Sequence, residues 1–289
     1  MAQRVSLTLH YFQKRTTFTE KEVSQAQLFL EKNLGTRANE TWSFKTIKAL
    51  RDGSLIDNIH RVLAVGGKKE LPIHIHFDDK EKIWPCSEEN RVIMSEWGLA
   101  QSCRNKEEIK AMLIHEAAHI TCPSIGLVYY PKLRHTSTSL LTPALSFHEG
   151  WANYWTALYS KKMLVWRNAA FTSFHKLHSN GKREKISGSR LKLRHYLCNS
   201  VTVGNLLWDL ACLPKGYEGM IKALRLAWKQ KAPTVVDLLS EYVYLYPKER
   251  STVLELLRNR TRNSGSKEQY DNVLNGTFFS FCERNKLPE

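Results

Sequence analysis

The sequence lacks several features that define common classes of protein. Its six cysteines form no C-x-x-C pair, which excludes a zinc ribbon and a thioredoxin-like redox centre. No run approaches the ~20 apolar residues of a membrane-spanning helix, so we expect no transmembrane segment. The first residues, M-A-Q-R-V-S-L-T-L-H-Y-F, lack the apolar core of a signal peptide. We therefore expect a cytoplasmic protein, or one that is delivered to another cell without such a signal.

Acidic residues are few relative to basic ones. The chain has 28 Asp and Glu against 43 Lys and Arg, a formal net charge of +15. Ten of the cations lie in residues 161–194, where Glu184 is the single acid. The Ser-Asn-Gly tripeptide at 179–181 and the Ser-Gly-Ser tripeptide at 187–189 predict a mobile loop in the middle of this segment. Two interpretations remain open for it: a solvated surface, or a contact with an acidic partner or nucleic acid.

One stretch, Met112–Ile120 (M-L-I-H-E-A-A-H-I), combines residues with a specific chemistry. His115 and His119 are four residues apart, so on an α-helix they lie on one face and can bind one metal ion. Glu116 lies beside them, where its carboxylate can take a proton from a metal-activated water. Only about 0.03 accidental H-E-x-x-H matches are expected in a chain with 11 His and 21 Glu. The alternative is a helix at 106–120 with two ordinary histidines.

A catalytic zinc usually takes three protein ligands and leaves one position for water. The candidates for the third ligand are Cys122, His135, His148 and Glu149. Cys122 shares the helix face of His115, but it lies too far along the axis to close one tetrahedral site. The metzincin pattern would need glycine and histidine where this chain has Cys122 and Ile125. We expect the ligand to be Glu149, in a helix predicted at 143–163.

With Glu149 on a second helix, the chain resembles the gluzincins, a group of zinc metallopeptidases in which a Glu from a later helix completes the site. The resemblance implies Zn²⁺ bound by His115, His119 and Glu149, with Glu116 as the general base. It also implies a protein or peptide substrate. The motifs that carry the resemblance cover residues 105–160.

Two further roles follow from the same resemblance. Gluzincins place an acid four residues after the ligating Glu, where it holds a zinc-bound His by a hydrogen bond. Here Asn153 occupies that position, and its amide oxygen can accept the same bond. A Tyr or His from a later helix commonly stabilises the oxyanion in gluzincins, which implies Tyr196 or, as the second choice, His195.

The pattern of apolar residues predicts an α+β fold that is mostly helical. Strand patterns occur at 5–12, 71–77 and 91–97, and we expect a small antiparallel sheet packed on the two-helix active site. Residues 91–97 are the candidate edge strand for pairing with an extended peptide substrate. Helices are expected at 20–34, 55–65, 106–120, 143–163, 191–213, 217–230, 235–244 and 248–259, and from residue 266.

We expect a single metallopeptidase domain over residues 1–289, with a mixed N-terminal lobe at about 1–121 and a helical C-terminal lobe at about 122–289. Two other functional classes remain open. The first is a basic nucleic-acid-associated protein with structural zinc or none, although structural zinc sites are Cys-rich and have no use for Glu116. The second is a delivered toxin or effector protease with the same chemistry.

Overall fold

A computed structural model describes residues 6–12, 42–50, 52–76, 82–88, 90–122, 136–160, 171–177 and 182–288. The fold is α+β and mostly helical, as predicted, with two small sheets. Two compact units make up the chain: residues 1–121 with 158–161, and residues 122–157 with 162–289. The single metallopeptidase domain stays a prediction, and the helix expected at 20–34 lies outside the described residues. Among the described helices, none has the length and apolar character needed to cross a membrane.

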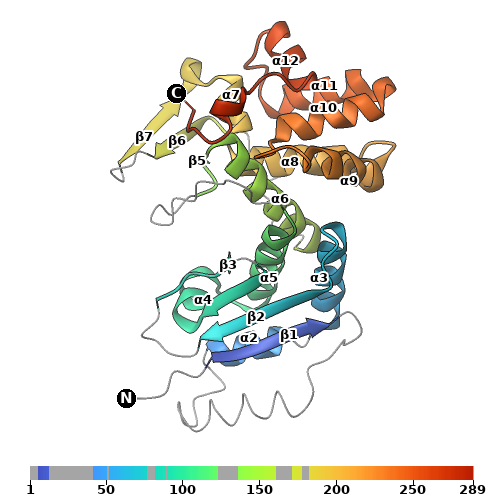
Figure 1. The fold of residues 1–289 in the computed structure, drawn as a ribbon. Coiled ribbons are helices and arrows are strands. Elements are labelled where there is room, and N and C mark those ends of the chain that lie inside the picture. The colour runs from blue at the N-terminus through green and yellow to red at the C-terminus, as the bar shows by residue number, and fades with distance from the viewer. Residues whose placement is uncertain are drawn as a thin grey trace. The chain divides into compact units, whose positions relative to one another are not determined.

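The first unit contains a four-stranded sheet in the order β1-β2-β4-β3 (Figure 1). Its strands are β1 (Ser6–Phe12), β2 (Glu70–His76), β3 (Cys86–Glu88) and β4 (Arg91–Ser95). The predicted antiparallel sheet is in fact mixed, because β2 and β4 are parallel. After β2 the chain enters β3 at the edge and returns through a hairpin, so β4 runs in the direction of β2. The prediction that residues 91–97 form an edge strand was wrong, since β4 lies between β2 and β3.

Four of the described helices accompany this sheet. They are α2 (Trp42–Leu50), α3 (Gly53–Val65), α4 (Glu96–Ser102) and α5 (Lys106–Thr121). The N-cap of α3 is Asp52, whose side chain accepts the Leu55 N–H at 3.2 Å. Helix α5 packs on β3 and β4 and against α2 and α3 (Figure 1). Because α5 has neighbours on several sides, apolar residues such as Leu113, Ile114 and Ala117 are fully buried.

The second unit has a three-stranded sheet in the order β5-β6-β7. Its strands are β5 (Ser139–Leu140), β6 (Ser173–Leu177) and β7 (Arg183–Ser187). Strands β6 and β7 are antiparallel, and Phe174 and Ile186, which lie opposite each other, are both buried. Strand β7 lies in the middle of the basic segment, where a mobile loop was predicted, so that prediction was wrong for residues 183–187.

The other elements described in the second unit are helices. Its α-helices are α6 (Pro143–Tyr159, of which the last two residues belong to the first unit), α7 (Leu193–Leu197), α8 (Ser200–Ala211), α9 (Gly216–Ala227), α10 (Val235–Leu245), α11 (Arg250–Arg260) and α12 (Lys267–Leu274). Helix α6 begins as predicted, since the Thr142 hydroxyl accepts the Leu145 N–H at 3.2 Å. The helix expected at 191–213 is two helices, because the Asn199 side chain caps a new one by accepting the Thr202 N–H at 3.0 Å.

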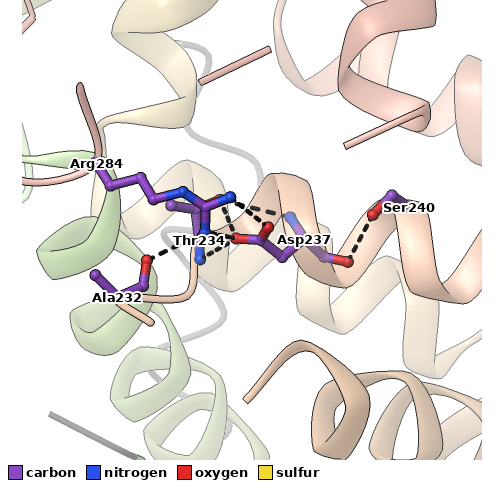
Figure 2. Close-up of polar contacts among 5 residues, drawn as sticks. All are labelled: Ala232, Thr234, Asp237, Ser240 and Arg284. Carbon is purple, nitrogen blue, oxygen red and sulfur yellow. Dashed lines mark hydrogen bonds and ion pairs between the residues drawn. The ribbon is translucent and has the colours of Figure 1, made fainter. Parts of the chain in front are cut away.

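A buried ion pair joins residues far apart in the second unit (Figure 2). The Asp237 carboxylate accepts hydrogen bonds from Arg284 Nη1 at 2.7 Å and Nη2 at 2.8 Å. It also accepts the Thr234 N–H at 2.7 Å and the Thr234 hydroxyl at 2.8 Å, which caps α10. The Arg284 carbonyl in turn accepts the Ala144 N–H at 3.0 Å. Arg284 therefore connects the start of α10 to the first turn of α6.

Candidate metal centre

Helix α5 brings the two motif histidines together. The Nε2 atoms of His115 and His119 are 3.1 Å apart, and the rings are nearly perpendicular at 87°. Two Zn–N bonds of about 2.0–2.1 Å at a tetrahedral angle would place the nitrogens roughly 3.3 Å apart. The pair therefore fits one zinc ion. Without a metal, the same separation allows one Nε2–H to donate a hydrogen bond to the other ring.

The motif lies in a largely buried part of α5. Glu116 is 6 % exposed and His119 is 8 % exposed, whereas His115 is half-buried. Burial of this kind excludes bulk water, so electrostatic interactions with a metal ion or a reacting group are stronger than at the surface. The half-exposed His115 marks the side of the helix that solvent can reach.

An ion-pair cluster fixes α5 against the start of α3. Lys110 Nζ donates to Asp52 at 2.6 Å and to Glu107 at 2.7 Å. The hydrogen bond from Lys110 lowers the pKa of Asp52 below its usual range. Asp52 also caps α3 through the Leu55 N–H, so one carboxylate joins two helices. This contact helps to set the rotation of α5 and therefore the direction of its histidines.

Glu149 lies on α6, next to Gly150, and it is 4 % exposed. A Cβ atom added to the neighbouring Gly150 would lie 2.5 Å from Cγ1 of Val203. A Cβ added to Gly204 would lie 3.1 Å from the Gly150 carbonyl oxygen and 3.2 Å from Cβ of Asn153. Glycine at these two positions allows the helices to pack closely, which fixes the backbone next to Glu149.

Aromatic side chains hold the following turn of α6. The Trp151 ring stacks on Tyr154 with centroids 5.8 Å apart, and it meets Trp155 and Trp228 edge to face at 5.6 Å. Trp151, Tyr154 and Trp155 are at most 1 % exposed. The expectation that this helix is buried nearly all round is therefore confirmed for the turn after Glu149.

Among the described residues, one group of three side chains could hold a metal ion, and it consists of His115, His119 and Glu149. Their ligand atoms all lie within 4.8 Å of one another. The group does not include His148 or Cys122. Cys122 is buried, which raises the pKa of its thiol. His135, the remaining candidate, lies outside the described residues.

The residues proposed for supporting roles have other contacts. His195 Nδ1 accepts the Lys192 N–H at 2.9 Å and so caps α7. The Tyr196 hydroxyl donates a long hydrogen bond of 3.5 Å to the Phe171 carbonyl, and burial raises its pKa. Asn153 is half-buried on α6 and forms no side-chain hydrogen bond with another described residue. The oxyanion role of Tyr196 or His195 and the supporting role of Asn153 stay predictions.

Two features that position the candidate ligands were missed in the sequence. Gly150 and Gly204 could have been found, because each is a glycine inside a strongly apolar helical pattern, where glycine usually marks a close approach. The contact between Lys110 and Asp52 had no local signal, since 58 residues separate its members.

Comparison with known proteins adds no further constraint. No protein family, curated protein or solved structure matches this chain. The motif residues of α5 and α6 and their geometry are therefore the basis for an assignment of function.

Proposed function

We propose that this chain is a zinc-dependent peptidase of the gluzincin type, with His115, His119 and Glu149 as metal ligands and Glu116 as general base. The observation that carries the proposal is the 3.1 Å separation of the two histidine Nε2 atoms on one helix, with a buried Glu next to His115. A histidine pair alone would serve many metal sites. The adjacent carboxylate is what hydrolysis needs in addition.

The chemistry divides between the metal and the chain. Zn²⁺, when bound, supplies a Lewis acid that lowers the pKa of water and polarises a peptide carbonyl. The Glu116 carboxylate accepts the proton of the attacking water and later delivers it to the leaving nitrogen. The proposed hydrogen-bond donor to the developing oxyanion is Tyr196, with His195 as the alternative.

Two measurements on each variant test this proposal: zinc per chain and cleavage of a mixed library of quenched fluorescent peptides. Glu116→Gln should keep one zinc per chain and lose cleavage by about 10²-fold or more. His115→Ala and His119→Ala should instead lose the zinc. Glu268→Gln makes the same chemical change on the exposed face of α12 and should alter neither quantity. Full cleavage by Glu116→Gln would refute the assignment of the base.

A second pair of variants tests the third ligand. Glu149→Gln should weaken zinc binding by about 10-fold or more, because an amide oxygen is a poorer ligand than a carboxylate. His148→Gln alters the neighbouring residue and should retain the metal, since His148 lies outside the candidate group. Loss of zinc from His148→Gln with normal binding by Glu149→Gln would exchange the two assignments.

A further inference from the structure

The excess positive charge is concentrated in the second unit. That unit contains 24 Lys and Arg against 12 Asp and Glu, out of 43 and 28 in the whole chain. Strand β7 gathers several of these cations at the surface. Residues 182–185 are all exposed, and Arg190, just after the strand, is 61 % exposed. Such a run of exposed residues is typical of an edge strand, which has a neighbour on one side only.

The register of the sheet shows which way the backbone of β7 points. His175 on β6 lies opposite Lys185, but the His175 N–H donates to the Thr138 carbonyl on the other side at 2.9 Å. The pair is therefore not hydrogen-bonded, so the N–H and carbonyl of Lys185 point away from β6. Arg190 Nη2 donates to this carbonyl at 2.7 Å, which shows that a donor can reach the outer edge.

The side chains of β7 alternate between two faces. Ile186 is buried, so Arg183 and Lys185, which are two residues apart, lie together on the opposite, exposed face. A strand added at the outer edge would place the Cβ atoms of its alternate residues about 4.5–5.5 Å from the Cβ atoms of Arg183 and Lys185. The Glu184 carboxylate lies on the face of Ile186 and pairs with Arg190 Nη1 at 3.7 Å.

We propose that the outer edge of β7 binds an extended acidic segment of a protein substrate as an added strand, with carboxylates at alternate positions facing Arg183 and Lys185. That the bound segment belongs to a substrate rests on the proposed function, whereas the binding of an acidic segment to β7 does not. A second copy of the chain would present the same cations and be repelled. A nucleic acid fits less well, because Phe174, the aromatic residue of the two described strands, is buried and offers no surface for base stacking.

Binding of two labelled peptides to the full-length Glu116→Gln protein tests the proposal by fluorescence anisotropy. The peptides are Glu-Thr-Glu-Thr-Glu-Thr-Glu-Thr and Glu-Glu-Thr-Thr-Glu-Glu-Thr-Thr, which have equal charge. The alternating peptide should bind about fivefold or more tightly than the second one, since only the alternating peptide has Glu residues two positions apart, which face both cations at once. Arg183→Glu with Lys185→Glu should abolish this preference and weaken binding at least about tenfold.

A matched control makes the same change of charge elsewhere in the second unit. Lys222→Glu with Arg225→Glu, on the exposed face of α9, should leave binding within about twofold. Equal losses from both double variants, or equal affinity for both peptides, would refute strand addition. If a single-stranded DNA oligonucleotide binds more tightly than the alternating peptide, and this binding depends on Arg183 and Lys185, the acidic segment is refuted as the occupant.

Two more outcomes separate the alternatives. If Arg183→Thr with Lys185→Thr causes self-association but leaves peptide affinity unchanged, the cations serve only to protect the edge, and the proposal fails. If the protein holds zinc and cleaves short neutral peptides but does not bind the alternating peptide, only the proposed binding at the outer edge of β7 is refuted. If Glu116→Gln binds the alternating peptide and still cleaves peptides, only the proposed general base is refuted.

Discussion

Arg284→Met tests how much the ion pair between Asp237 and Arg284 stabilises the second unit. The pair is buried, with Asp237 at 8 % and Arg284 at 12 % side-chain exposure. Methionine keeps the apolar stem but removes both guanidinium hydrogen bonds from the Asp237 carboxylate. Removing one member of a buried pair costs about 3–5 kcal/mol. Because the two hydrogen bonds from Thr234 remain, we expect the lower end, about 3 kcal/mol.

Urea unfolding followed by tryptophan fluorescence measures this loss, since Trp151, Trp155 and Trp228 are in the second unit. Arg190→Met is the control, because the pair of Arg190 with Glu184 is exposed, with an N–O distance of 3.7 Å. Its free energy of unfolding should change by no more than about 0.5 kcal/mol. A loss below about 1 kcal/mol for Arg284→Met, or equal losses for the two variants, would contradict the argument from burial.

Two further predictions concern helix packing and pH. Gly150→Ala should lower the free energy of unfolding by about 1 kcal/mol or more, because the new Cβ would lie 2.5 Å from Cγ1 of Val203. Gly53→Ala is the control and should change this free energy little, because a Cβ at residue 53 would have nothing within 4 Å. Equal effects of the two variants in urea unfolding would contradict the prediction. The lowered pKa of Asp52 means that its ion pair stabilises the fold above the unfolded-state pKa of about 3.9 and loses this effect as pH falls through the folded-state pKa. Lys110→Met should therefore reduce the difference in unfolding free energy between pH 7 and pH 3, and an unchanged difference would show that Lys110 does not cause the shift.

Local sequence signals predicted the helices that carry the candidate site. Thr142 and Pro143 begin α6 because an N-cap and a proline in the first turn act within a few residues. The same kind of signal was overlooked at Asn199, whose side chain divides the helix expected at 191–213. The pair of strands β6 and β7 was also missed, although the apolar positions 174 and 186 alternate with polar ones, because the Ser-Asn-Gly and Ser-Gly-Ser tripeptides suggested a loop.

Contacts between distant residues account for what the sequence did not predict. Residues 91–95 form a strand as expected, but the place of β4 within the sheet depends on pairing with β2 and β3, which no local pattern contains. The histidine pair was predictable because both rings lie on one helix. The third ligand was not fixed in this way, since thirty positions separate His119 from Glu149 and several side chains in that interval had suitable chemistry.

The hydrogen bond from the Ala144 N–H to the Arg284 carbonyl also has a consequence for the order of folding. During synthesis, the first turn of α6 emerges long before its acceptor, so this part of the second unit cannot be completed until residue 284 has left the ribosome. Contacts of such long sequence separation form slowly, because the intervening chain must first be ordered. We expect Glu149 to reach its final position late, after the two histidines of α5 are in place.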